Sequence, residues 1–363
     1  ARVQVPPLTP RPTFMAMSSG SADAVADVDS FVRTGPVYSA LRNPVAGEEW
    51  HRYGKVVVEK LKGASGAEVS VAPSSLEPAL AARVYHLYLP MYFWMRELVA
   101  ASRAAAGPVG GDGHKTVVVG LSAPQGCGKT TVVEFLTSLF HGDGFNCVAV
   151  SIDDFYLRGD ELDAIASANP DNTLLQGRGN AGTHDLALWD STLQALCKAD
   201  QSDVDVPVFD KSLRGGKGDR APIEGWRRER TPCDVVLVEG WMGAFKARDD
   251  AAALSEIDPG LPTVNDHLRA YQALDDHVDG WCVIAVSDRQ RIFDWRLQAE
   301  HAMAAAGRPG MDDEGVRKFV ARYMPAYEAY CPALYDSGSG AGVDGKPTLM
   351  VHVNGARNPV QPS

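Results

Sequence analysis

One stretch of the chain constrains its fold more than any other: VVVGLSAPQGCGKTT, Val117–Thr131. An apolar run of strand type leads into a loop of small residues, and an apolar helical pattern follows. The loop contains A-x-x-x-x-G-K-T, a pattern typical of a phosphate-cradling loop between a strand and a helix N-terminus. Together with later apolar strands that alternate with helices, this order predicts an α/β fold with a parallel sheet flanked by helices.

The loop is of the P-loop NTPase type, and its residues have separate roles. Lys129 reaches the β- and γ-phosphates, and the Thr130 hydroxyl can hold Mg²⁺. Ala123 replaces the first glycine of the strict pattern, which requires a negative φ there. Cys127 sits beside a helix N-terminus, where a thiol pKa can fall, but we favour a small loop residue without a redox role. We assign ATP binding to Ala123, Pro124, Gln125, Gly126, Cys127, Gly128, Lys129, Thr130 and Thr131.

Composition argues against several other classes of protein. The formal net charge of −11 argues against nonspecific nucleic-acid binding and means that an anionic substrate needs a local basic cluster. No apolar run is long enough to span a bilayer. The six cysteines show no C-x-x-C pair and no metal-site spacing, which suits a reducing compartment. We expect a small-molecule substrate as the only partner, no nucleic acid, no membrane, and a monomer.

Composition shifts divide the chain into three parts. Residues 1–30, rich in Pro, Ser and Ala, are predicted to be a disordered leader or the remnant of an organellar transit peptide. Residues 31–113 are predicted to be an N-terminal helical region that ends in a linker at Ala101–Gly113. Its aromatic residues between Tyr85 and Trp94 are predicted to pack against the next domain. The P-loop domain then covers residues 114–357.

Acidic residues follow two further apolar strands. Cys147–Ile152 is followed by Asp153 and Asp154, and Asp234–Gly240 contains Glu239 near its end. Ligands bind at the carboxyl ends of parallel strands, so these carboxylates are expected beside the transferred phosphate. We prefer Asp153 as the base that accepts the proton of an attacking hydroxyl, and we consider Asp154 as a helix N-cap. Glu239 fits the acid that holds Mg²⁺ through water.

Two Gly-rich segments supply a basic cluster. The first is Leu175–Asp185, and the second, Val206–Arg220, carries several cations within a short span. Either segment alone could be a solvated turn, but two of them after a phosphate loop favour a binding site. The candidate side chains are Arg178, His184, Asp185, Lys211 and Arg220.

Asp288–His301 is predicted to be a helix that carries three arginines. Such arginines suit a lid that closes over the phosphates and offsets charge during transfer, or they pair with acidic residues of the same helix. We expect Arg291 to pair in this way and Arg296 to belong to the lid. Further on, Gly315–Leu334 is predicted to be one helix with a core-packing aromatic stripe, and the loop Asn354–Arg357 is expected to border the base of the nucleotide.

The chain resembles a known family on a set of motifs in matching order. They are GLSAPQGCGKTT, VSIDDFYL, GRGNAGTHD, VFDKSLRGGKGDR, VLVEGW, FDWRLQAE and FVARYMPAYEAYCPAL. Single motifs are shared with the phosphoribulokinase, uridine kinase and pantothenate kinase superfamily. Their joint presence over about residues 75–355 resembles the plant-type D-glycerate 3-kinases.

The resemblance implies phosphorylation of D-glycerate at its 3-hydroxyl by MgATP, giving 3-phosphoglycerate and ADP. It also implies the last step of photorespiration and a location in the chloroplast stroma. By this resemblance Asp153 is the base, Glu239 and Thr130 hold Mg²⁺, and Lys129 acts on the phosphates. The motifs that line the implied acceptor site contain Arg178, His184, Asp185, Lys211 and Arg220, and we assign Asp154 and Tyr156 to the same substrate site.

Two alternatives remain open from the sequence. One is another kinase of the same superfamily, acting on pantothenate, a nucleoside or a sugar phosphate. The other is a nucleotide-dependent switch that transfers phosphate only to water. The sequence lacks the N-K-x-D guanine signature, which argues against a GTPase switch.

Overall fold

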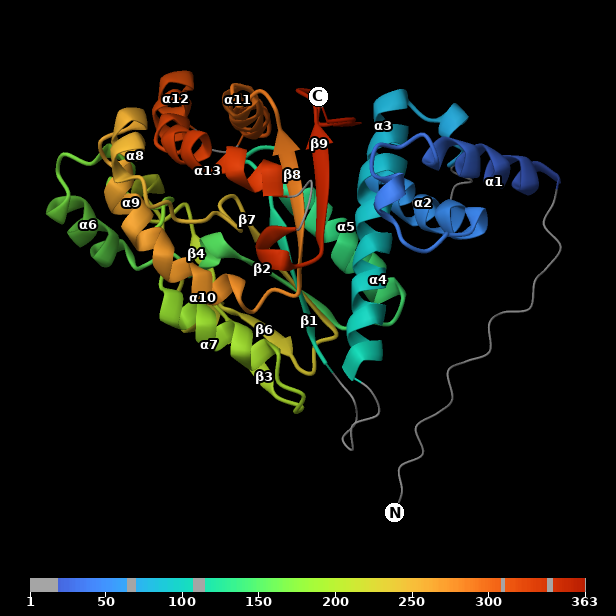
Figure 1. Cartoon of the computed structure of the whole chain (residues 1–363), viewed down its shortest axis with the longest axis horizontal. Helices are drawn as coiled ribbons and strands as arrows, with labels where there is room; N and C mark the ends of the chain where they lie inside the picture. The colour runs from blue at the N-terminus through green and yellow to red at the C-terminus, as the bar shows by residue number, and fades with distance from the viewer. Residues whose placement is uncertain (1–18, 64–69, 107–114, 308–310, 338–341, 363) are drawn as a thin grey trace, which may run out of the picture.

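The computed structural model describes residues 19–63, 70–106, 115–307, 311–337 and 342–362. A six-stranded sheet lies at the centre, in the order β10-β9-β8-β1-β7-β2, and helices flank it (Figure 1). All its pairings are parallel except that of β10 with β9. The strands are β1 (Val117–Ser122), β2 (Cys147–Ser151), β7 (Val235–Gly240), β8 (Gly280–Val286), β9 (Thr348–Val353) and β10 (Pro359–Val360). The predicted α/β class is therefore confirmed.

The central strands are apolar on both faces because helices cover both sides of a parallel sheet. Every residue of β1 and of β8 is buried. The register places Ser122 opposite Gly240, and Ser151 opposite Glu239. The phosphate loop after β1, the acid of β7 and the acids after β2 therefore meet at one edge of the sheet.

The described residues also form α-helices and two short ribbons. The helices are α1 (Ser19–Val32), α2 (Gly47–Lys62), α3 (Pro78–Arg83), α4 (Leu89–Ala106), α5 (Lys129–Gly142), α6 (Gly159–Ala168), α7 (Leu186–Leu196), α8 (Ala251–Ile257), α9 (Leu261–Leu268), α10 (Gln272–Asp275), α11 (Arg291–Ala305), α12 (Asp313–Ala321) and α13 (Met324–Ser337). The two ribbons pair β3 (Asp203–Val206) with β6 (Arg227–Arg230) and β4 (Phe209–Asp210) with β5 (Asp219–Arg220).

The N-terminal helices share a core with the sheet. The predicted aromatic packing face is confirmed: Tyr88 lies 5.1 Å from Phe135 and Tyr92 lies 5.0 Å from Phe140, between ring centroids. Both phenylalanines belong to α5, the helix that follows the phosphate loop. The N-terminal region therefore packs on the helix that follows the phosphate loop (Figure 1).

Three predicted boundaries are wrong. Helix α1 covers Ser19–Val32 and buries Val28, so the part of the predicted leader from residue 19 onward is ordered; residues 1–18 lie outside the described residues. Helix α4 ends at Ala106, where the helical pattern of the N-terminal region was predicted to end, so the predicted linker begins too early, at Ala101; residues 107–114 are not described. The stretch predicted as one helix, Gly315–Leu334, is divided between α12 and α13.

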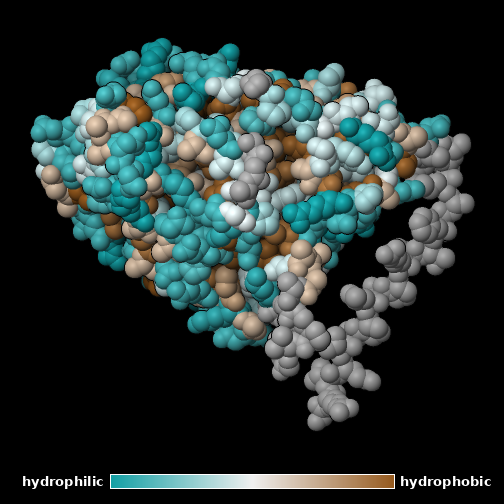
Figure 2. All heavy atoms as spheres, viewed as in Figure 1, coloured by the Kyte–Doolittle hydropathy of each residue, from teal (hydrophilic) through white to brown (hydrophobic). Residues whose placement is uncertain are grey.

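Hydrophilic residues cover most of the face shown in Figure 2, as expected for a chain with a net charge of −11. In the described part of the chain, no helix combines the length and the apolar character needed to cross a membrane.

Candidate active site

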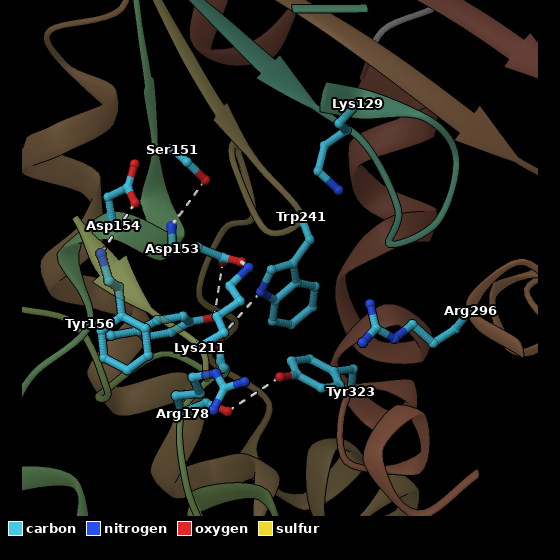
Figure 3. Close-up of polar contacts among 12 residues, drawn as sticks. Lys129, Ser151, Asp153, Asp154, Tyr156, Arg178, Lys211, Trp241, Arg296 and Tyr323 are labelled. Atoms are coloured by element: carbon cyan, nitrogen blue, oxygen red, sulfur yellow. Dashed lines mark hydrogen bonds and ion pairs between the residues drawn. The ribbon is translucent and has the colours of Figure 1, made fainter. Parts of the chain in front are cut away.

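The phosphate loop keeps its shape through glycines and a folded-back lysine. Gly126 and Gly128 have φ values of 77° and 100°, in the left-handed region that favours glycine. Ala123 has no positive φ, so its methyl group is tolerated as predicted. The Lys129 ammonium donates to the carbonyl oxygens of Ala123 (3.1 Å) and Pro124 (3.2 Å), which places it over the loop (Figure 3).

Residues from distant elements hold this loop in place. The Gln125 N–H donates to the Tyr327 hydroxyl of α13 at 3.0 Å, and Arg357 Nε donates to the Gly126 carbonyl at 2.8 Å. The loop after β9 that carries Arg357 therefore touches the phosphate loop. Cys127 is buried, and burial raises the pKa of its thiol. A raised pKa argues against a reactive thiolate at this position.

Asp153 lies in a short helical turn, Ile152–Phe155, directly after β2. Its Oδ2 atom accepts from Lys211 Nζ at 2.6 Å, and its Oδ1 atom accepts from the Tyr156 hydroxyl at 3.0 Å (Figure 3). Burial alone would raise the pKa of Asp153, but the charges of Lys211 and Lys129 lower it to about 2. The carboxylate is therefore ionised and faces the phosphate loop.

Asp154 has a different environment from its neighbour. The cap of the turn is the Ser151 hydroxyl, which accepts from the Asp153 N–H at 3.3 Å, so the N-cap role considered for Asp154 is wrong. Asp154 Oδ1 accepts from the Phe209 N–H at 3.4 Å, and burial raises its pKa. Asp154 therefore ties β4 to the end of β2.

Glu239 and Thr130 fit a magnesium site. Among the described residues, the buried Glu239 Oε2 atom has no hydrogen-bond partner, so a carboxylate oxygen is available at the sheet edge. Thr130 is exposed in the first turn of α5, directly after the phosphate loop. Mg²⁺ prefers oxygen ligands, usually one or two carboxylates together with substrate phosphates and water. These two residues match that donor set.

The first basic segment places His184 in a buried position. Its Nδ1 atom lies 2.7 Å from the Tyr271 hydroxyl, and its ring stacks on Tyr156 with centroids 4.4 Å apart. The Gly182 N–H donates to the same Tyr271 oxygen at 3.1 Å, so the Tyr271 proton is directed to Nδ1. Burial lowers the pKa of His184 to about 3, so the imidazole is neutral. Its buried Nε2 atom has no hydrogen-bond partner in the part of the chain that the structure describes.

Asp185 and Arg220 form a buried brace between the two basic segments. Asp185 caps α7 by accepting from the Leu188 N–H at 3.0 Å. Arg220 donates to Asp185 Oδ2 at 3.0 Å and to the Tyr156 carbonyl at 2.9 Å. Only 9% of the Arg220 side chain is exposed. Both residues contact protein groups, which gives them a positioning role in this structure.

Arg178 and Lys211 lie near each other in the site (Figure 3). Arg178 Nη1 donates to the Gly216 carbonyl at 3.1 Å, and the Arg178 carbonyl accepts from the Tyr323 hydroxyl at 3.2 Å. Trp241, directly after β7, packs edge-on against Tyr323 at 5.0 Å and donates from Nε1 to the Gly179 carbonyl at 3.2 Å. Trp241 and Tyr323 therefore hold the first basic segment in place through hydrogen bonds to its backbone carbonyls.

The chain is similar in sequence and in structure to known kinases. The chain is 37% identical to the chloroplastic D-glycerate 3-kinase of Arabidopsis thaliana over 345 residues, 93% of this chain and 73% of the relative. The chain belongs to the D-glycerate 3-kinase family. A solved structure of D-glycerate 3-kinase from Cryptococcus neoformans matches with a TM-score of 0.63 and 31% identity, over 74% of this chain and 97% of that one. An uncharacterized kinase of Schizosaccharomyces pombe is 35% identical over 226 residues, 60% of this chain and 82% of the relative. No protein-family model matches the chain.

Both Arg291 and Arg296 of α11 pair with acidic residues. This pairing was expected for Arg291, whereas for Arg296 a role in a lid was favoured. Arg291 Nε lies 3.1 Å from Asp288 and its Nη1 atom 3.1 Å from Asp294, as expected. Arg296 hydrogen-bonds to Glu300, whose side chain is buried. The Arg296 guanidinium nevertheless points toward the side of Asp153 and Lys211 (Figure 3), and its Nε atom is buried without a partner. Its role in a lid stays a prediction.

The sheet edge of this kinase brings together Lys129, Asp153 and Lys211, with Tyr156 and His184 behind them. Sequence patterns did not reveal Trp241, Tyr271 and Tyr323, whose polar atoms position the basic segments. Tyr323 and Tyr327 were predicted only as core residues. Their hydroxyl groups bond to the two loops of the site, and a tyrosine in place of phenylalanine within a buried stripe is the signal that could have indicated this.

Proposed function

We propose that this kinase transfers the γ-phosphoryl group of ATP to the 3-hydroxyl of D-glycerate, giving 3-phosphoglycerate and ADP. One observation carries the proposal: an ionised carboxylate, Asp153, lies beside the phosphate loop with cations on both sides, Lys129 and Lys211. A small anionic acceptor needs such a local positive field in a chain of net charge −11. The similarity to D-glycerate 3-kinases over most of the chain supports this acceptor.

Positioning and electrostatics do most of the work in phosphoryl transfer. Asp153 accepts the proton of the 3-hydroxyl while that oxygen attacks the γ-phosphorus. Lys129 leaves its two loop carbonyls and contacts the phosphates. Lys211 and Arg178 hold the carboxylate of D-glycerate, and this contact selects which hydroxyl faces ATP. Arg296 offsets the developing charge when α11 closes over the phosphates.

Thr130 and Glu239 hold Mg²⁺ in this proposal, supported by the unpartnered Glu239 oxygen. The metal supplies neutralisation of the phosphate charge. Glu239 acts through its carboxylate at the end of β7, and Thr130 through its hydroxyl in the first turn of α5. The same proposal includes a monomeric enzyme without nucleic-acid or membrane partners.

A photorespiratory role in the chloroplast stroma is the finer part of this proposal. Its support is the chloroplastic relative from Arabidopsis thaliana. Fractionation of the source organism, with detection of the protein by antibody, tests the compartment separately from the activity.

The activity is tested with MgATP and D-glycerate, followed by detection of 3-phosphoglycerate, with L-glycerate as the matched control. Pantothenate, uridine and ribulose 5-phosphate test the related kinases in the same assay. Efficient turnover of D-glycerate alone supports the proposal. Faster turnover of one of the other acceptors overturns it, and ATP hydrolysis without any phosphorylated product favours a nucleotide-dependent switch.

A further inference from the structure

Both carboxylate oxygens of the proposed base accept a hydrogen bond in this structure. Lys211 donates to one carboxylate oxygen of Asp153 at 2.6 Å, and Tyr156 donates to the other at 3.0 Å. An ammonium group this close lowers the basicity of the carboxylate and occupies one of the two acceptor positions of Oδ2. Asp153 is therefore poorly prepared to deprotonate a hydroxyl until Lys211 leaves it.

Lys211 is free to move while its backbone stays in place. Its side chain is 57% exposed, and within the described residues its ammonium hydrogen-bonds to Asp153 alone. The segment that carries it is fastened on its far side, where Arg178 donates to the Gly216 carbonyl at 3.1 Å. A lysine combines a compact charge with a flexible four-carbon stem, so it can exchange one carboxylate for another without a change in the loop.

The proposed acceptor brings such a second carboxylate. In D-glycerate, three bonds of ~1.5 Å separate the 3-oxygen from the carboxylate carbon, so the two lie within about 4 Å of each other. When the 3-hydroxyl reaches Asp153, the acceptor carboxylate lies within reach of Lys211. Glycerol offers the same primary hydroxyl without the charge, and water offers neither the charge nor the carbon chain.

We propose that Lys211 occupies Asp153 in the free enzyme and moves to the carboxylate of the bound acceptor, so that the base is released only for an acid substrate. This inference rests on the proposed function and adds a specificity device to it. After the exchange, the 3-hydroxyl proton passes to Asp153 Oδ2 as the bond from O3 to the γ-phosphorus forms. The bond from the γ-phosphorus to its bridging oxygen breaks, and its electron pair leaves with ADP.

The exchange predicts a gain of activity that a simple binding role does not. In Lys211→Met, the KM for D-glycerate should rise at least about 10-fold, because a charge-assisted hydrogen bond to the substrate is lost. The kcat/KM for glycerol should rise about 10-fold, because Asp153 regains its basicity. ATP hydrolysis without an acceptor should rise as well. The measurement is a coupled ADP-release assay with D-glycerate, 3-hydroxypropionate, glycerol and no acceptor.

Two further variants separate the possible explanations. Lys217→Met makes the same substitution in the same loop at an exposed side chain and should change none of these rates. Lys211→Arg keeps the charge and should keep glycerol turnover low. The wild type should use 3-hydroxypropionate, which has the carboxylate but no 2-hydroxyl, far better than glycerol.

The outcomes distinguish this inference from the proposed function. If glycerol turnover and ATP hydrolysis in Lys211→Met stay at or below those of the wild type, the inference is overturned even though D-glycerate remains the substrate. If the wild type does not phosphorylate D-glycerate, the proposed function itself fails. Because the Lys211 side chain is exposed, its substitution is not expected to disturb the fold. Thermal unfolding of each variant checks this directly.

Discussion

The nucleotide side of the site is the phosphate loop, and its proposed acceptor side lies around Asp153, Lys211 and Arg220. These two sides are held together in different ways. On the nucleotide side, one contiguous loop is fixed through its own backbone, by bonds from Gln125 N–H to Tyr327 and from Arg357 to the Gly126 carbonyl. On the acceptor side, separate segments meet through side chains, as in the pair of Asp153 with Lys211. The first arrangement depends on backbone conformation, and the second depends on charge.

This difference bears on what each side can do. Backbone bonds and left-handed glycines leave a loop few alternatives, which suits a phosphate site that is the same in every turnover. An ion pair between partly exposed groups contributes only about 0–1 kcal/mol to stability, so it can exchange partners at little cost. In the proposed function, the acceptor side can therefore respond to the substrate while the phosphate loop stays fixed.

Asp153→Asn should have the largest effect on turnover, and this effect should be limited to the acceptor side. An amide cannot accept the hydroxyl proton, so kcat should fall by about 10²–10⁴-fold while ATP affinity stays nearly unchanged. Steady-state kinetics and ATP titration measure the two quantities. Asp160→Asn, at an exposed position in the first turn of α6, is the control. Wild-type kcat in Asp153→Asn would show that the base is another group.

Arg220→Met tests how much of the acceptor side depends on a buried brace. The substitution leaves Asp185 and the Tyr156 carbonyl without their shared donor, and the free energy of unfolding should fall by about 2 kcal/mol. This is below the usual cost of breaking a fully buried pair because Asp185 is 28% exposed. Denaturant unfolding measures the change.

The matched control for this brace is Arg228→Met. Arg228 pairs with Asp205 on an exposed ribbon, where its side chain is 68% exposed, and the change should be within about 1 kcal/mol. Equal losses of unfolding free energy in the two variants would mean that the burial of Arg220 contributes no extra stability.

The sequence predicted the nucleotide side better than the acceptor side for the same physical reason. A phosphate loop is local, so the strand, the glycines and Lys129 are adjacent in the chain and specify one another. The ends of β2 and β7 could also be anticipated, because parallel strands place Asp153 and Glu239 at one edge.

The acceptor side depends on contacts between residues far apart in the chain. Nothing in the periodicity around Tyr271 indicates that its hydroxyl meets His184, 87 positions away. The division of Gly315–Leu334 into α12 and α13 was missed because apolar residues continue at helical spacing across the break. The roles of Asp185 and Arg220 as partners of each other needed the fold as well.

Gly126→Ala should damage the nucleotide side and spare the acceptor side. A Cβ atom at this position would lie 2.7 Å from the Trp295 Cβ atom, and a φ of 77° costs an alanine about 1–2 kcal/mol. An alanine could be accommodated only by a displaced loop. A free-energy penalty of this size corresponds to a rise of about 10-fold in the KM for ATP. The KM for D-glycerate should stay close to that of the wild type.

The control for this glycine is Gly142→Ala at the end of α5. A Cβ atom there meets nothing within 4 Å, and the residue has no positive φ. If both variants bind ATP as the wild type does, the loop is less rigid than its backbone contacts indicate.

The pH dependence of kcat/KM should show the smallest effect in the wild type and a larger one in Lys211→Met. The folded-state pKa of Asp153, about 2, lies below its ordinary value, so the carboxylate stays ionised as pH falls to about 3. The profile for D-glycerate should therefore show no acid limb from Asp153 between about pH 5 and 8. Removal of the Lys211 charge leaves burial as the largest influence, which raises the pKa and moves an acid limb upward.

Other charged and titratable groups around Asp153 limit how far that limb can move. They are Lys129, His184, Tyr156 and Asp154. The ammonium of Lys129 remains and opposes the rise, whereas His184 is neutral above about pH 3 and adds no charge. The stability that Lys211 gives through this pair is present above the unfolded-state pKa and is lost only as pH falls toward 2. An identical acid limb in wild type and Lys211→Met would mean that this lysine does not control the base.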